Sequence, residues 1–306
     1  MEGPHRRRTD LSRRGDRPAR TGPAPGGTGP HHRAGPLRRH LRVRDPPRGR
    51  PRQRGPARPP AARARQRGDV YKRQTGAFPA RGRISAEDGR LTGTAPTVPW
   101  LRDATHVLVP DAERALWLVR TDAPGVRTSP VETTAPWSAG RLVLSGAEAE
   151  RIGSDGAYEH TLAAARTAFA GLQAGVCAGS LDRAVQYTST REQFGRPLST
   201  NQGVMLRAAD AHMDTEAIRV TTYEAAWRID QGLEAREHAL TAAWWASEAG
   251  KRVVHAGQHL HGGMGADLDH PVHRHFLWGR QLDAYLGCGS ELLAELGASI
   301  AEGEQV

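Results

Sequence analysis

The chain has 306 residues and a net charge of +10, but residues 1–74 alone carry 22 basic and 5 acidic residues, which leaves a net charge of −7 after Gln74. No stretch approaches the ~18 consecutive apolar residues that a membrane span needs. The two cysteines, Cys177 and Cys288, give neither a metal-binding spacing nor a disulfide framework. The sequence therefore argues against a membrane protein, a metal site and a disulfide-rich secreted protein, and the default expectation is a cytoplasmic location.

Residues 1–74 cannot build a hydrophobic core. This segment holds 12 of the 21 prolines and no Ile, Phe or Trp, so it cannot bury enough apolar surface to offset the entropy of ordering. We predict a disordered Arg/Pro-rich head.

The head also resembles GC-rich DNA translated out of frame. It ends in residues 69–74, Asp-Val-Tyr-Lys-Arg-Gln, which is one reading frame of the transposon mosaic end GATGTGTATAAGAGACAG. Our hypothesis is that residues 1–74 are a frameshifted fragment joined to an adaptor. The alternative is a natural Arg-rich tail that binds nucleic acid through phosphate contacts, although no aromatic residues are interleaved with its arginines.

Residues 75–152 are predicted to form a partial β-domain. Asp88-Gly89 lies between two short apolar runs and is typical of a hairpin turn. Pro96 and Pro99 predict that the stretch from Gly93 to Trp100 is not a regular strand. Turn residues separate three further strands of a small antiparallel module, which are predicted at residues 105–109, 115–119 and 141–144.

After Gly153 the apolar residues recur with a helical period. Ser154 or Asp155 is expected to cap a first helix, whose apolar stripe runs from Leu162 to Tyr187. Long amphipathic helices with short connections predict an antiparallel bundle over residues 153–306. Four more helices are predicted: from about Ser199 to Gly232, from about Glu234 to Gly257, from Pro271 in a first turn, and after Gly289.

The second of these helices carries large apolar residues along one face. We expect that face to pack in the bundle core, where such side chains usually lie. Its members are Met205, Ala209, Met213, Ala217, Val220, Tyr223 and Trp227. The predicted fold class is α+β, mainly α, with a truncated small antiparallel β-domain followed by an antiparallel four-helix-type bundle.

Three motifs, taken in order, resemble the acyl-CoA dehydrogenase family. The segments AEDGRLTG (residues 86–93) and ATHVLVP (residues 104–110) resemble its middle β-domain. TREQFGRPL (residues 190–198), followed by a Gln and an Asp, resembles its R-x-x-F-G … Q … aD signature, and this is the most specific motif. HGGMG (residues 261–265) and HPVHR (residues 270–274) resemble its late glycine turn and the helix after it.

This resemblance implies a flavoprotein that oxidises an acyl-CoA thioester between Cα and Cβ. In the family a carboxylate removes the α-proton, FAD accepts the β-hydride, and an electron-transfer flavoprotein reoxidises FAD. A thioester α-proton is only weakly acidic, so a positioned base and polarisation of the carbonyl group are both required.

The resemblance also assigns cofactor contacts to the bundle, which in this family serves the FAD of a neighbouring subunit. Arg191 would contact the pyrophosphate, because a guanidinium fork of donors suits phosphate oxygens. Phe194 would pack on the cofactor, and Gln202 would hydrogen-bond it. From the residues alone, Arg191 could instead form a surface salt bridge with Glu192 or another acid.

A second set of cofactor contacts is implied near the glycine turn. Gly262, Gly263 and Gly265 would let the backbone approach the adenosine side of FAD. His259 stands where a cofactor-binding Gln is usual. From the residues alone, the glycines could also serve a tight turn between helices.

The residues at the family's two base positions cannot accept a proton. Most members carry a Glu in a Tyr-Glu-Gly turn, where this chain has Leu286. A minority place the Glu on the first long bundle helix, where this chain has Ala165. Asp283 is expected to be a solvated surface acid, because two residues from Tyr285 on a helix it points elsewhere. The other nearby acids that could substitute are Glu291, Asp267 and Asp269.

A missing base beside a retained cofactor set resembles one subunit of heteromeric dehydrogenases that act on steroid side-chain CoA esters. The family's N-terminal helical domain and the start of its β-domain are replaced by the head, so this chain is not expected to hold FAD alone. We predict a non-catalytic subunit that shares FAD with a partner subunit and meets acyl-CoA through that partner. The alternatives are an active homo-oligomeric dehydrogenase with a displaced base, and a nucleic-acid-binding protein that acts through the head.

Overall fold

A computed structural model describes residues 74–78 and 84–303. The chain divides into two units, Met1–Ala64 and Arg65–Val306, and every described residue belongs to the second. The predicted head and its nucleic-acid-binding alternative therefore lie outside the described residues, apart from Gln74, which opens the first strand.

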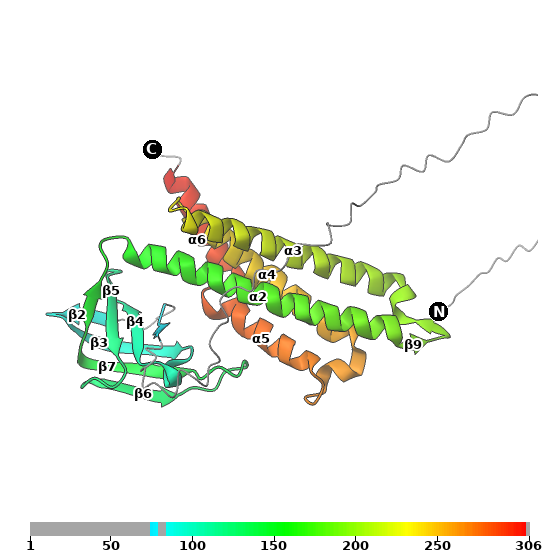
Figure 1. The fold of residues 1–306 in the computed structure, drawn as a ribbon, viewed down its shortest axis with the longest axis horizontal. Helices are drawn as coiled ribbons and strands as arrows, with labels where there is room; N and C mark the ends of the chain where they lie inside the picture. Colours follow the sequence, from blue (N-terminus) through cyan, green and yellow to red (C-terminus); the bar gives the residue numbers. More distant parts are fainter. Residues whose placement is uncertain (1–73, 79–83, 304–306) are drawn as a thin grey trace, which may run out of the picture. The chain divides into compact units, whose positions relative to one another are not determined.

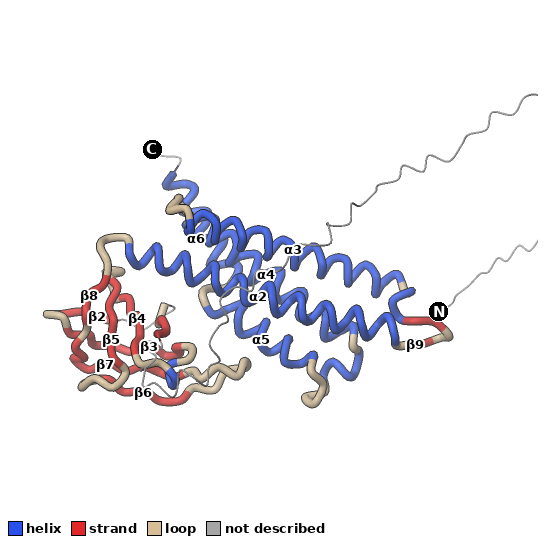
Figure 2. The backbone as a smooth tube through the Cα atoms, viewed as in Figure 1, coloured by secondary structure: helices blue, strands red, loops and turns tan. Residues whose placement is uncertain are grey.

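The β-domain consists of two four-stranded sheets with the orders β1-β4-β5-β8 and β2-β3-β7-β6 (Figure 2). The three strands predicted after Trp100 correspond to β4, β5 and β7. Pairing is antiparallel except between β1 and β4, which are parallel, so the expected antiparallel module is correct apart from that edge. The strands are β1 (Gln74–Gly76), β2 (Ile84–Glu87), β3 (Arg90–Val98), β4 (His106–Pro110), β5 (Leu116–Arg120), β6 (Val126–Pro130), β7 (Gly140–Glu148) and β8 (Glu150–Ile152).

The hairpin between β2 and β3 forms as predicted. Asp88 and Gly89 both have positive φ, +47° and +72°, which is the two-residue turn that matches strand twist. The expected irregularity between Gly93 and Trp100 is confirmed, although β3 continues through Pro96 to Val98. Pro96 lies where the β3–β7 register shifts, and β2 pairs no further than Gly93. Such an irregular position tolerates a missing N–H.

The helical bundle confirms all five predicted helices. Figure 1 shows consecutive long helices running in opposite directions along the bundle. None of the described helices is both long enough and apolar enough to cross a membrane. The helices are α2 (Ala157–Thr190), α3 (Gln202–Asp230), α4 (Arg236–Leu260), α5 (Val272–Tyr285) and α6 (Gly289–Gly303), with short 3-10 turns η2 (Leu198–Thr200) and η3 (Gly262–Ala266).

The predicted cap of α2 is wrong. Neither Ser154 nor Asp155 caps the helix; the N-cap is Gly156, whose φ of +85° places it in the left-handed region. The Ser154 carbonyl instead accepts a bond from the Ala157 N–H at 3.1 Å. A glycine that can adopt positive φ thus starts the helix by its backbone turn alone.

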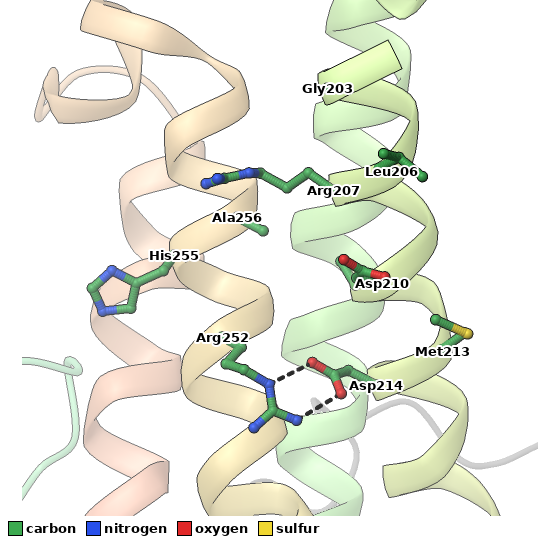
Figure 3. A pocket seen from close by; sticks show the side chains of 10 residues that line it. Gly203, Leu206, Arg207, Asp210, Met213, Asp214, Arg252, His255 and Ala256 are labelled. Atoms are coloured by element: carbon green, nitrogen blue, oxygen red, sulfur yellow. Dashed lines mark hydrogen bonds and ion pairs between the residues drawn. The ribbon is translucent and has the colours of Figure 1, made fainter.

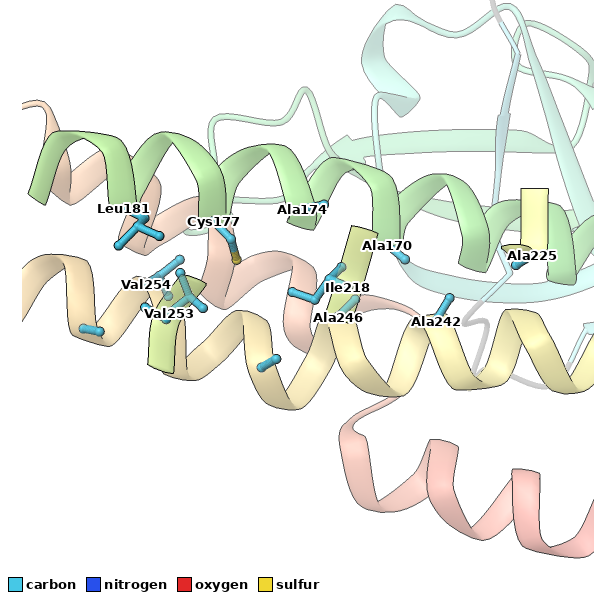
Figure 4. Close-up of a cluster of buried hydrophobic side chains, with 13 residues drawn as sticks. Ala170, Ala174, Cys177, Leu181, Ile218, Ala225, Ala242, Ala246, Val253 and Val254 are labelled. Atoms are coloured by element: carbon cyan, nitrogen blue, oxygen red, sulfur yellow. The ribbon is translucent and has the colours of Figure 1, made fainter. Parts of the chain in front are cut away.

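Small residues dominate the bundle core. Figure 4 shows them between α2, α3 and α4. A Cβ added to Gly250 would lie 1.9 Å from Gln173 Nε2, and one added to Gly257 would lie 2.0 Å from Ser180 Oγ. The helices therefore pack closely on alanine and glycine. The buried cluster is Ala170, Ala174, Cys177, Leu181, Ala211, Ile218, Ala225, Ala242, Ala246, Ala249, Val253, Val254 and Ala256.

The expectation that the large apolar face of α3 packs in the core is wrong. Met213 and Val220 are each 62% exposed, and Trp227 is 55% exposed. The helix instead buries a face of small and short polar residues around Ile218. The large apolar side chains of α3 are therefore exposed in this chain.

Candidate functional site

The R-x-x-F-G motif forms a tight hairpin at the end of α2. Strands β9 (Glu192–Gln193) and β10 (Arg196–Pro197) pair antiparallel. The turn between them is Phe194-Gly195, and both residues have positive φ, +56° and +74°. Arg191 is the C-cap of α2, and its carbonyl accepts a bond of 2.9 Å from the Leu198 N–H, which closes the hairpin.

The side chains of this hairpin point to solvent. Phe194 is 101% exposed although it is a large apolar residue held in a left-handed conformation, which costs free energy for a residue other than glycine. Arg191 is also exposed, and among the described residues its guanidinium forms no ion pair. The salt bridge considered for Arg191 is therefore not found in the described part of the chain, and both groups are available to an external ligand.

The glycine turn η3 follows α4. Gly262 has a φ of +62°, and a Cβ on Gly265 would lie 2.2 Å from the Gln258 carbonyl oxygen. The fold itself therefore requires glycine at these two positions. Gly263 differs, because a Cβ placed there meets nothing within 4 Å in the described chain and its φ is not positive. Its lack of a side chain suits close approach by a group outside the described chain.

A stack of rings joins the hairpin to the glycine turn. Tyr187, whose carbonyl accepts the Arg191 N–H at 2.9 Å, stacks on His261 with centroids 4.9 Å apart. The Tyr187 hydroxyl also lies 3.9 Å from the sulfur of Met264 in η3. No role was predicted for these two rings, although Tyr187 lies one helical turn before Arg191 and His261 opens the HGGMG motif.

The remaining predicted cofactor residues lie on helix ends. Gln202 is the first residue of α3 and is exposed. Asn201 caps this helix by accepting the Gly203 N–H at 2.9 Å. His259 is exposed in the last turn of α4. The polar side chains of Gln202 and His259 therefore both lie on the surface.

A groove of about 720 Å³ runs between α3 and α4 (Figure 3). Asp210, the acid that ends the signature, lies in it together with the apolar side chains of Leu206 and Met213. Asp214 and Arg252 form a bidentate ion pair across the groove, with distances of 2.7 and 2.9 Å. The groove therefore continues the exposed face of α3 and adds charged groups to it.

The base positions lie close to a separate cavity of about 300 Å³. Leu286, the C-cap of α5, lines this cavity and packs beside the buried ring of Tyr285. Ala165 lies on α2 directly before Arg166, another lining residue. Neither base position offers a titratable side chain.

Two carboxylates line the same cavity, and both are engaged. Arg166 donates to both oxygens of Glu295 at 2.8 and 2.6 Å. That hydrogen bond lowers the pKa of Glu295, so this group is a weak base, whereas an efficient general base titrates near the working pH. Glu291 accepts the backbone N–H of Cys288 at 3.1 Å.

The prediction that Asp283 is a solvated surface acid is wrong. Its side chain is buried and pairs with Arg280, and burial raises the pKa of Asp283 above its usual range. It does not line the cavity beside Leu286. Asp283 is therefore a buried acid in an ion pair with Arg280 and not a solvated surface acid.

Replacing Glu295 with Gln should lower the free energy of unfolding by about 1–3 kcal/mol. This is less than the 3–5 kcal/mol for a fully buried pair, because the Glu295 side chain is 37% exposed while that of Arg166 is 9% exposed. Since the folded-state pKa of Glu295 is lowered, the stabilisation is present above about pH 4.3 and is lost as pH falls through the folded value. Urea unfolding across this pH range measures both effects.

The matched control is the exposed pair of Arg120 and Asp122, whose side chains are 67% and 68% exposed. Asp122→Asn should leave the urea midpoint unchanged. Equal midpoint shifts in the Glu295 and Asp122 variants would contradict a special contribution from the buried arginine.

Known proteins are similar to most of the described chain. A family model described as acyl-CoA dehydrogenase, C-terminal domain, matches residues 156–300. Acyl-CoA dehydrogenase FadE27 of Mycobacterium tuberculosis is 40% identical over 230 residues, and the match covers 70% of this chain. The chain thereby spans 61% of the length of FadE27.

Two solved structures are also similar. The Tcur3481-Tcur3483 steroid ACAD matches with 40% identity and a TM-score of 0.72, over 77% of this chain and 69% of that chain. The ChsE4-ChsE5 complex from Mycobacterium tuberculosis matches with 35% identity and a TM-score of 0.70, over 75% of this chain and 66% of that chain.

Proposed function

The chain belongs to the acyl-CoA dehydrogenase family, and we propose that it is a non-catalytic subunit that completes the FAD site of a base-bearing partner. The observation that carries this proposal is the contrast between two sites on one chain. The base positions hold Leu286 and Ala165 beside carboxylates that are already engaged, whereas Arg191 and Phe194 present unengaged, solvent-facing groups.

The exposed residues fit FAD. Arg191 would bind the pyrophosphate through its donors, and Phe194 would cover an aromatic ring of the cofactor with its own exposed ring. Gln202 and His259 supply polar groups, while Gly263 leaves room for close approach alongside Gly262 and Gly265. When bound, FAD accepts the hydride that leaves Cβ of an acyl-CoA thioester and passes the electrons to an electron-transfer flavoprotein.

We propose a CoA ester of a steroid side chain as the substrate of the assembled enzyme. The 40% identity to a steroid ACAD supports this class. The base that removes the α-proton and the acyl-binding cavity would both belong to the partner, so this chain would meet the substrate only through the assembly.

The exposed face of α3 supports assembly with another subunit of this family. Four of its large side chains recur every seven residues, at positions 206, 213, 220 and 227, and Leu206 and Met213 also line the charged groove between α3 and α4. A heptad spacing suits packing against a further helix. The exposed face consists of Met205, Met213, Val220, Tyr223 and Trp227 from the predicted stripe, together with Leu206.

The double variant Met213→Asp, Val220→Asp should abolish the complex, because each new carboxylate would be buried in an apolar interface at a cost of several kcal/mol. The full chain is co-expressed with a family subunit that carries the Tyr-Glu-Gly turn, and size-exclusion chromatography with light scattering measures the mass. FAD content and turnover should fall together with the complex.

The control for this experiment is Leu293→Asp, which adds the same charge at another exposed apolar residue, on α6. It should leave the mass and the FAD content of the complex unchanged. A complex of normal mass in the Met213 and Val220 double variant would show that the α3 face does not form the interface.

A further inference from the structure

His261 is the buried link between the two halves of the candidate cofactor site. It is 3% exposed although it directly precedes the solvent-facing glycine turn. Its ring stacks almost parallel on Tyr187, at an interplanar angle of 19°, and lies 5.0 Å from the ring of His270. It therefore contacts both the end of α2 and the segment that leads into α5.

The hydrogen bond of His261 fixes its ring. Nδ1 lies 2.7 Å from the carbonyl oxygen of Gly257, and because a carbonyl oxygen only accepts, Nδ1 carries the hydrogen. The same residue ends α4 through its own N–H, which donates to the Gln258 carbonyl at 3.2 Å. The ring and the start of η3 therefore cannot turn independently.

The charged and titratable groups around His261 come from every neighbouring element. Tyr187 and Arg183 face it from α2, His270 from the segment before α5, and His275 from α5. Burial, with smaller effects from His270 and Arg183, lowers the pKa of His261, although the bond to Gly257 acts in the opposite direction. The buried ring is therefore neutral near pH 7.

We propose that His261 is a positioning residue whose neutral ring holds the Gly262–Gly265 turn against the end of α2, and so keeps it at a fixed spacing from Arg191 and Phe194. This inference rests on the proposed function, because it assumes that both halves hold one cofactor. A two-point contact needs its points placed to within about 0.5 Å. The ring of Tyr187 joins α2 to the turn through the stack on His261 and through the contact of its hydroxyl with the Met264 sulfur at 3.9 Å.

The proposal makes FAD binding sensitive to acid. The folded-state pKa of His261 lies below about 6.5, so the neutral arrangement is intact above that pH and is lost as pH falls through the folded value. A proton on the ring would add a buried charge near Arg183 and His270. We expect the turn to move away from α2 when this happens.

The test is an FAD titration of the complex with the base-bearing subunit, from about pH 8 to about pH 5. The dissociation constant of the unsubstituted complex should rise by about tenfold on acidification. His261→Phe keeps a ring on Tyr187 but cannot titrate, so it should bind FAD within about threefold of the unsubstituted complex and lose the pH dependence. His261→Ala should bind about tenfold more weakly throughout. His160→Phe, at an exposed histidine of α2, should keep the pH dependence.

A second measurement needs no cofactor. Hydrogen exchange of the Asp267 amide, which donates to the Met264 carbonyl at 3.2 Å and closes η3, is followed in the full chain. Relative to His261→Phe, the unsubstituted chain should lose protection of this amide in acid. Equal protection in both, or an unchanged pH dependence of FAD binding in His261→Phe, would overturn the positioning role. A complex that binds no FAD at any pH would instead contradict the proposed function and leave the exchange result to decide the role of His261.

Discussion

Replacing Arg191 with Ala should weaken FAD binding to the assembled complex by about tenfold to a hundredfold. A charge-assisted hydrogen bond contributes about 1.5–3 kcal/mol, and each 1.4 kcal/mol is a factor of ten in affinity. The guanidinium has no ion-pair partner among the described residues, so its removal should leave the fold intact. Equilibrium dialysis with FAD measures the affinity, and far-UV circular dichroism checks the fold.

The control is Arg196→Ala, which removes a positive charge from the other strand of the same hairpin. If Arg191 binds the pyrophosphate directly, Arg196→Ala should retain FAD much better than Arg191→Ala. Equal losses would indicate a general effect of positive charge, and unchanged binding in Arg191→Ala would contradict the assigned contact.

Local chemistry made much of the fold predictable. The Asp88-Gly89 turn needs two positive φ angles, and few residue pairs other than Asp-Gly or Asn-Gly supply them easily. The helix at Pro271 was likewise predictable, because proline suits the start of a helix and Pro271 is its N-cap. These signals depend on neighbouring residues only.

The buried faces of the helices were not predictable in the same way. The large side chains on α3 suggested a core face, yet Met213 and Val220 are exposed while Ile218 is buried among alanines. Most residues of the buried cluster are alanines, and α4 packs on α2 at Gly250 and Gly257, so burial in this bundle does not follow side-chain size. The large apolar stripe of α3 therefore lies on the surface of this chain and not in its interior.

Only those residues of the candidate site that belong to a sequence motif could be predicted. Arg191, Phe194 and the glycines were assigned through their resemblance to the family's motifs, but the stack of Tyr187 on His261 joins residues 74 positions apart in sequence. No periodicity links such residues, because the contact depends on how α2 and α4 pack. Asp283 was missed for a different reason: its partner Arg280 lies three residues away on α5, but the burial of the Asp283 side chain depends on how that helix packs.

We predict that the base for proton abstraction lies on the partner subunit, so that substitutions there have a large effect on turnover. Leu286 cannot accept a proton, and the carboxylate of Glu295 is held by Arg166. Proton abstraction should therefore depend on the partner's Tyr-Glu-Gly glutamate. Replacing that glutamate with Gln should slow turnover by about 10²–10⁴-fold, the usual contribution of a general base, whereas Leu286→Ala on this chain should leave turnover unchanged.

Anaerobic bleaching of the flavin absorbance with an acyl-CoA thioester tests whether the catalytic base lies on this chain or on its partner. The full chain purified alone should retain no FAD and show no bleaching. Its complex with the base-bearing subunit should be yellow and bleach rapidly, and the complex with the partner's Glu→Gln substitution should stay yellow. If the chain alone is yellow and bleaches, or if the substituted complex still bleaches at the original rate, the base lies on this chain and it is a catalytic subunit.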